Sequence, residues 1–240
     1  MDNCLNYSKN KIFGNWDFYK LCISIAVPVM AQQLIMGLVS LIDNFMVAEL
    51  GDIKMAAVNV ANQLNFMYLV ILYTFYGAGG IYMAQNNGAN NQEGMQQAFR
   101  FKVILPLFIS IVYMILMLIN PEIFMRLLTQ GNYAQNEILD SSSKYMKIIA
   151  FTFIPISISG AIGSSYREIG KPHIPLVISV IATACNTFGN WILIYGNLGA
   201  PRLEETGAAI STLIARILEM SLFIIYIKLH KEKFYVRTRE

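Results

Sequence analysis

Two stretches of an otherwise apolar chain carry side chains that could bind or exchange a cation. Asp43 and Asn44 follow one long apolar run, and Thr183, Asn186 and Asn190 recur at the i, i+3 and i+7 spacing of one helix face. A carboxylate at the centre of a membrane helix costs ~2.5–3.5 kcal/mol on translocon scales, so such groups usually face a bundle interior or water. An ionised Asp43 could coordinate a cation such as Na+, or it could alternate between protonated and ionised forms. We therefore predict that Asp43 is an ion-coupling residue and that Asn44 and Thr183 help to line a polar cavity.

Each of these patterns also has a plainer explanation. Asp43 could lie at the outer membrane interface and reach water there. The side chains of the 183–190 stripe could make interhelical hydrogen bonds, worth ~0.6 kcal/mol each on average. Arg216 and Glu219 are three residues apart, so they can pair along one helix face and lower the cost of inserting both. For these two residues the sequence favours structural pairing over a role in transport.

The remaining reactive residue types form no recognisable catalytic or metal site. The sequence contains no nucleophile motif, P-loop or HExxH pattern, and Cys4, Cys22 and Cys185 have no CxxC spacing. His173 has no second ligand at metal-binding spacing, and the basic residues are too dispersed for a nucleic-acid site. We therefore expect neither an enzyme nor a cofactor, and a gradient of Na+ or H+ is the remaining source of energy.

Long apolar helices must position these residues. Hydrophobic residues make up 55% of the 240 residues and charged residues 14%, compared with roughly 25% charged in a soluble domain. Five charge-free runs are each long enough to cross ~30 Å of hydrocarbon as a helix, and a sixth apolar stretch contains Arg216 and Glu219. The charge-free runs are 21–42, 55–92, 103–121, 148–166 and 174–201. The predicted spans are 18–46, 57–84, 98–120, 144–166, 173–196 and 207–229.

Six crossings predict an all-α, polytopic membrane protein with both termini on one side. Residues 1–17 would form a polar segment, 18–229 a six-helix transmembrane lobe and 230–240 a basic segment. The first apolar run is longer than the roughly 7–15-residue core of a signal peptide, so we expect an uncleaved first span. If the N-terminus is cytoplasmic, twelve of the 18 Lys and Arg residues lie on that side, five lie opposite and Arg216 lies within a span. The positive-inside rule then places both termini in the cytoplasm.

Five stretches resemble, in order along the chain, the multidrug and toxic compound extrusion (MATE) family. They are 28–51 with Pro28 and Asp43, AAVNVANQ at 56–63, QNNGA at 85–89, REIGKPHIPL at 167–176, and 186–212. The last two lie close together and are much more specific than any single short motif. The similarity covers about residues 18–229, in the order expected of the family's N-terminal lobe.

The resemblance implies one six-helix lobe of a MATE-type transporter, a binding cavity between two such lobes, and export of organic cations in exchange for Na+ or H+. It also implies that Asp43, Asn186, Asn190 and Thr212 occupy the cation-site positions of the N-terminal lobe. Some family members carry a carboxylate where this chain has Asn190, which leaves Asp43 as the sole acid among the four. Either Na+ or H+ therefore stays open as the coupling ion.

One departure from the family concerns length, because family members normally have about twelve spans, built as two repeats, and this chain has six predicted ones. A truncated gene product, which we favour, a lobe that joins a separately encoded partner, and a homodimer would each explain the difference. We expect the partners to be membrane lipid, an organic cation and a second six-helix lobe, in the plasma or inner membrane. Two other functions stay open. One is a non-transporting assembly subunit, and the other is a flippase for lipid-linked substrates. A dense cationic cavity would favour the flippase, but of the basic residues assigned above only Arg216 lies within a span.

Overall fold

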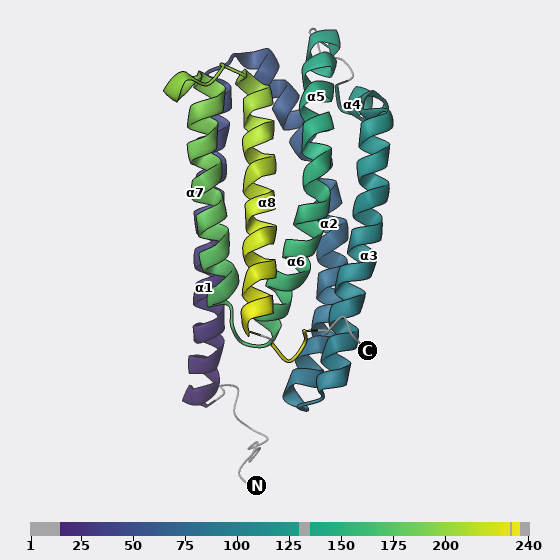
Figure 1. Ribbon diagram of the computed structural model, residues 1–240, viewed down its shortest axis with the longest axis vertical. Coiled ribbons are helices and arrows are strands. Elements are labelled where there is room, and N and C mark those ends of the chain that lie inside the picture. The colour runs from purple at the N-terminus through teal and green to yellow at the C-terminus, as the bar shows by residue number, and fades with distance from the viewer. Residues whose placement is uncertain (1–14, 130–134, 231, 236–240) are drawn as a thin grey trace, which may run out of the picture.

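The computed structural model is a bundle of long helices that stand side by side (Figure 1). It describes residues 15–129, 135–230 and 232–235, and no strand occurs among them. In chain order the helices are α1 (Trp16–Ala48), α2 (Asp52–Gly88), α3 (Gln92–Ile119), α4 (Pro121–Thr129), α5 (Gln135–Ile149), the 3-10 helix η1 (Ala150–Thr152), α6 (Phe153–Glu168), α7 (His173–Tyr195), the 3-10 helix η2 (Asn197–Gly199) and α8 (Glu204–His230).

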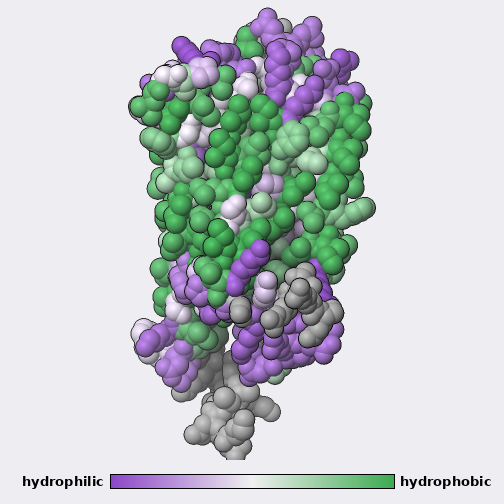
Figure 2. Space-filling model, in the orientation of Figure 1, coloured by the Kyte–Doolittle hydropathy of each residue, from purple (hydrophilic) through white to green (hydrophobic). Residues whose placement is uncertain are grey.

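Six helical segments have the length and composition of membrane spans, with α5, η1 and α6 together forming the fourth. The shortest is α7, whose 23 residues extend ~35 Å at 1.5 Å per residue, while a bilayer core is ~30 Å thick. Figure 2 shows hydrophobic residues over the middle of the molecule and hydrophilic residues at both ends. The start of α1 and the end of α8 lie at the same end of the bundle (Figure 1). The predicted fold class, an all-α polytopic membrane protein with six spans, is confirmed.

The helices differ from the predicted spans in their detail. The third begins earlier, at Gln92, because Asn91 caps a polar first turn by accepting a hydrogen bond from the Gly94 N–H at 3.2 Å. The fourth is interrupted at 150–152 by a turn of 3-10 helix. The short helix α4 was not predicted, because its nine residues are far fewer than a membrane span needs. His173, at the predicted start of the fifth span, is the first residue of α7.

The interior of the bundle contains many polar side chains, while large apolar ones cover its surface. Tyr68 illustrates this arrangement, because its fully buried side chain connects three helices. Its hydroxyl lies 2.7 Å from Ser110 Oγ of α3 and donates to the Phe153 carbonyl of α6 at 2.8 Å. Lipid offers no hydrogen-bond partner, so hydroxyl groups pair with other groups of the protein, such as a second hydroxyl or a backbone carbonyl.

Close packing of α7 on α8 sets the spacing between the residues of these two helices. Gly207 of α8 lies against the backbone of α7, where an added Cβ would come within 2.6 Å of the Leu193 carbonyl oxygen. One turn further along α8, Ser211 Oγ donates to the Asn186 carbonyl at 2.7 Å. Gly196 ends α7 with φ of 77°, a left-handed conformation that glycine adopts without strain. Small residues therefore let the two backbones approach closely.

The described part of the C-terminal segment, residues 232–235, packs against the helices. Phe234 is fully buried, and its ring centroid lies 5.1 Å from that of Phe99 and 5.4 Å from that of Tyr166. Of the two predicted terminal segments, residues 1–14, 231 and 236–240 lie outside the described residues.

An ion pair joins α3 to α6 at the end of the bundle that holds the start of α1. Lys102 has a side chain with 0% exposure, and its Nζ lies 2.5 Å from Glu168 Oε2 and 3.1 Å from Ser165 Oγ. Burying a charge without a partner costs several kcal/mol. Lys102 and Glu168 therefore depend on each other, and each stabilises the contact between the two helices.

We predict that Lys102→Met lowers the free energy of unfolding by about 3 kcal/mol, because it leaves Glu168 unpaired. Adding Glu168→Leu should recover most of this loss. Urea unfolding in mixed micelles, followed by far-ultraviolet circular dichroism, measures both effects. The matched control is Lys144→Met, which breaks a pair with Asp140 whose side chains are 63% and 67% exposed, and which should cost less than about 1 kcal/mol. Equal losses for Lys102→Met and Lys144→Met would contradict the prediction.

Candidate functional site

A cavity of about 770 Å³ opens in the half of the bundle that lies away from the start of α1 and the end of α8. Its wall is formed by the later part of α1, the early part of α2, the junction between α5 and α6, the middle of α7 and the early part of α8. All six residues predicted from the sequence lie on this wall: Asp43, Asn44, Thr183, Asn186, Asn190 and Thr212.

Asp43 is held by two amide side chains that α7 presents one turn apart. Asn190 Nδ2 donates to Asp43 Oδ1 at 2.8 Å. The oxygen and nitrogen of an amide are distinguished by their hydrogen-bond partners. In one orientation of the Asn186 amide, the nitrogen has an acceptor and the oxygen has a donor. In that orientation Asn186 donates to Asp43 Oδ2 at 3.1 Å and accepts from the Thr212 backbone N–H at 3.2 Å. Each carboxylate oxygen thus receives an N–H donor, and Asp43 lies on the cavity wall.

Further oxygen atoms beside Asp43 could help to hold a cation. Asn190 Oδ1 is buried and accepts no hydrogen bond from the described residues. Thr212 Oγ1 donates to the Ala208 carbonyl at 2.9 Å, which leaves its lone pairs for another partner. Hard cations bind carboxylate, amide carbonyl and hydroxyl oxygens, so this donor set suits Na+. Within the described part of the chain Asp43 is the one acid on the cavity wall, and a proton or a monovalent cation would neutralise it.

The α2 wall carries amide side chains that the sequence analysis did not select as site residues. Asn59, Asn62, Gln63 and Asn65 all line the cavity, and Asn65 Oδ1 is buried with no hydrogen-bond partner among the described residues. Four amide side chains in a stretch of seven residues, inside a charge-free span, were a usable signal for a cavity wall, because polar side chains inside a membrane usually face a water-filled interior. The stretch 56–63 was used only for the family resemblance.

Arg216 reaches the cavity from α8 and is the one base on its wall in the described chain. Its Nη1 donates to Glu219 Oε2 at 2.8 Å, which confirms the pairing predicted from their spacing. Glu219 is buried and also accepts from Ser179 Oγ at 3.0 Å, while Ser179 accepts from Gln32 Nε2 at 2.9 Å. The sequence did not reveal these last contacts, because their partners lie on other helices. The ion pair is therefore part of a network that joins α1, α7 and α8.

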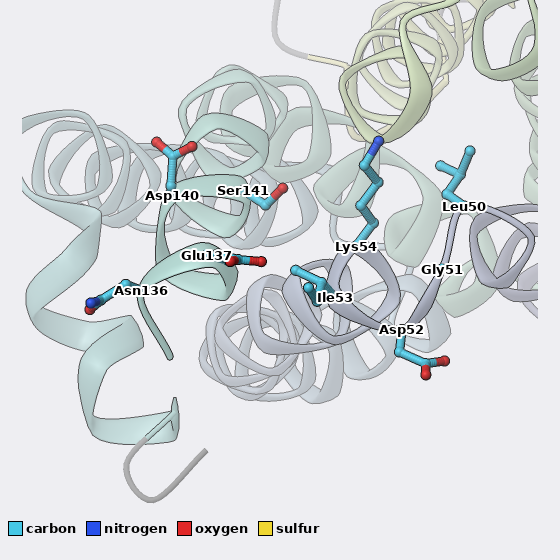
Figure 3. Close-up of a pocket in the computed structure, with 9 residues that line it drawn as sticks. All are labelled: Leu50, Gly51, Asp52, Ile53, Lys54, Asn136, Glu137, Asp140 and Ser141. Atoms are coloured by element: carbon cyan, nitrogen blue, oxygen red, sulfur yellow. The ribbon is translucent and has the colours of Figure 1, made fainter. Parts of the chain in front are cut away.

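A second, more open hollow of about 730 Å³ lies at the end of the bundle opposite the start of α1. Figure 3 shows its lining residues, which come from the turn between α1 and α2, the first turn of α2 and the first two turns of α5. Lys54 in this hollow pairs with Glu204 and Glu205 at the start of α8. None of the residues predicted from the sequence lines it, and its ion pairs tie α2 to α8 beside the main cavity.

Comparison with known proteins identifies the family. The family model MatE matches residues 28–192, more than half of the chain. The chain belongs to the MatE family. Curated relatives of this MatE chain include the probable multidrug resistance protein NorM of Thermotoga maritima, 24% identical over 223 residues, with 91% of this chain and 46% of the relative covered. The multidrug resistance protein NorM of Vibrio cholerae is 25% identical over 218 residues, with 91% and 47% covered. The chain spans about half the length of the curated relatives it matches.

Solved structures agree with this assignment at the level of the fold. A crystal structure of MATE in the bent conformation matches with a TM-score of 0.77 and 23% identity, over 92% of this chain and 48% of that one. The outward-facing conformation of a multidrug resistance MATE family transporter matches with a TM-score of 0.74 and 20% identity, over 92% and 47%. The predicted resemblance to one MATE lobe is confirmed, and MatE proteins are transporters rather than enzymes. The roles of the cavity residues stay predictions.

The cavity predicts where water reaches the membrane-spanning part of this MatE chain. In a variant with Ser at Cys4, Cys22 and Cys185, a cysteine introduced by Asn44→Cys should react with a charged, membrane-impermeant thiosulfonate, because the reaction needs a thiolate in contact with water. The matched control is Leu41→Cys on the same helix, since Leu41 is 55% exposed but does not line the cavity. We expect labelling of Asn44→Cys to be about tenfold faster or more. Equal rates in liposomes would show that the cavity is not filled with water.

Proposed function

We propose that this MatE chain is one lobe of a secondary transporter that exports organic cations in exchange for inward movement of Na+ or H+. The observation that supports this is the position of Asp43, the one acid on the cavity wall among the described residues, between the amides of Asn186 and Asn190. A cationic substrate and the coupling ion both need this negative charge. Binding of either one therefore opposes binding of the other, and exchange requires such competition.

The size of the electrostatic effect is sufficient for coupling. Two unit charges 4 Å apart attract each other by roughly 4 kcal/mol at an effective dielectric constant of about 20. That energy corresponds to about a thousandfold in affinity. Neutralising Asp43 with a proton or Na+ would thus release most of a bound organic cation. The ion and the substrate would then stabilise different states of the lobe, as alternate access requires.

A second six-helix lobe would complete the transporter. Only Gln32 and Val47 of α1 are buried, and α1 packs more extensively on α7 than on α2. The cavity-lining amides Asn59, Asn62 and Gln63 are likewise exposed in the single lobe. These surfaces support a partner lobe across the cavity, either a C-terminal half or a second copy of this chain. Lipid of the plasma or inner membrane would cover the remaining apolar surface.

Substitution of Asp43 tests the coupling. Asp43→Asn keeps the size of the side chain and its contact with Asn190 but removes the charge, so it should abolish ion-driven efflux while leaving insertion and thermal stability intact. The assay uses the purified chain in proteoliposomes, with an imposed pH or Na+ gradient and ethidium as the substrate. We expect the gradient-driven rate to fall by about a hundredfold or more, given the charge interaction that is lost.

The matched control for this experiment is Asp140→Asn, the same chemical change at an exposed position outside the main cavity. It should leave the rate unchanged. Unchanged coupled transport by Asp43→Asn would remove Asp43 from the mechanism. If the chain moves ethidium only when a second lobe is present, it acts as a half-transporter. If it moves ethidium under neither condition, a non-transporting assembly subunit is the better description.

The orientation in the membrane can be tested separately. The excess of Lys and Arg at the end of the bundle that holds the start of α1 and the end of α8 supports a cytoplasmic location for both termini. Green fluorescent protein fused after Glu240 should therefore fluoresce in bacterial cells, whereas alkaline phosphatase fused at the same place should be inactive. The reverse pattern would place both termini outside the cytoplasm.

A further inference from the structure

The guanidinium of Arg216 lies where a substrate could reach it. Arg216 is close to the middle of α8, and its side chain is 34% exposed on the wall of the main cavity. The carboxylate of its partner Glu219 is on the buried side of the pair, with 8% of the side chain exposed. The two members of the pair therefore differ in their access to the cavity. Here the positive member faces the cavity.

The network behind Arg216 holds it in this position. Glu219 uses Oε2 to accept from Arg216 and Oε1 to accept from Ser179, which in turn accepts from Gln32. All three of these partners are buried. Among the described residues Arg216 donates through Nη1 alone, although a guanidinium carries five N–H groups in a planar fork. Its remaining donors are therefore open to a ligand in the cavity, and their position is fixed in advance.

Arg216 and Asp43 face the cavity at different depths. Thr212 stands four residues before Arg216 on α8, which is ~6 Å along the helix axis at 1.5 Å per residue. Asn186 links Thr212 to Asp43 through its two amide ends. A negative charge thus lies near the level of Thr212, and a positive charge lies about one helical turn deeper. Two opposite charges placed in this way orient a ligand of complementary charge and exclude ligands whose charges are arranged differently.

We propose that Arg216 binds an anionic group of the substrate, so that the cavity selects zwitterionic organic molecules with the cationic group towards Asp43 and a carboxylate on Arg216. This inference rests on the proposed role of the cavity as the substrate site and narrows its substrate class. Arginine suits the task because its fork matches a carboxylate with two parallel hydrogen bonds. A simple cation would gain nothing from Arg216, whose charge is balanced by Glu219.

Direct binding tests this assignment without any need for transport. The probes are tetramethylrhodamine methyl ester, a cation, and its parent free acid, which has the same ring system and carries a carboxylate in place of the methyl ester. Fluorescence anisotropy with the purified chain in nanodiscs should give an affinity for the acid about tenfold higher than for the ester, the size expected of a charge-assisted pair. The variant is the double substitution Arg216→Gln with Glu219→Gln, which leaves no lone buried charge. In this variant the ratio of the affinity for the acid to that for the ester should fall about tenfold, while the affinity for the ester itself should change less than about twofold.

The control is Lys144→Gln, which removes an exposed cation outside the cavity and should leave both affinities unchanged. Equal binding of acid and ester by the natural chain, or an acid preference that survives in the double variant, would overturn the proposal. Failure of both dyes to bind would also overturn the proposal for Arg216. The proposed transport function would not be affected by that result, because the ethidium efflux assay tests it separately. A chain that prefers the acid but moves no substrate, either alone or with a second lobe, would keep Arg216 as the anion site and overturn the transport function instead.

Discussion

Hydrocarbon cannot solvate a backbone amide or a charge, and the whole arrangement of this lobe follows from that constraint. The backbone satisfies its own hydrogen bonds within helices long enough to cross the bilayer. Apolar side chains such as Leu34 and Phe108 can then lie on the outside, where a soluble protein would have charges. Hydroxyl and amide groups turn inward and pair between helices, as Tyr68 does with α3 and α6. The same constraint makes a charged side chain in a span expensive, so Lys102 and Arg216 are paired with glutamates, and Asp43 lies on the cavity wall.

The geometry of the candidate site depends on how closely α7 and α8 approach each other. Gly207 leaves room for the α7 backbone, and the hydrogen bond from Ser211 to the Asn186 carbonyl aligns the two helices at the level of the site. Asn186 can then contact both Asp43 and Thr212. A side chain larger than glycine at position 207 would separate the helices and move the amides away from the carboxylate. The precision of the site is therefore a property of packing rather than of the polar residues alone.

Much of the fold could be predicted from the sequence, because hydrophobic length and the absence of charge are local signals. The six spans, the inward position of Asp43 and the shared stripe of Asn186 and Asn190 depend on such signals and on the resemblance to MATE proteins. The form of the break at 150–152, a turn of 3-10 helix, was not predicted, although Pro155 is a local signal for it, because proline has no N–H to donate to the Phe151 carbonyl four residues earlier. The contacts from Gln32 through Ser179 to Glu219 were also missed, as each side chain lies on a different helix and its polar type does not reveal its partner.

The buried pair between Lys102 and Glu168 also bears on how the lobe is assembled during synthesis. The two residues are 66 positions apart, so α3 leaves the ribosome well before the carboxylate of α6 is available. Until then the ammonium group of Lys102 must stay solvated, and its flexible stem allows it to reach the lipid headgroups. Docking of α3 against α6 can be completed only after the fourth span has entered the bilayer. The order of synthesis thus implies a membrane-inserted, loosely packed intermediate in which Lys102 is not yet paired with Glu168.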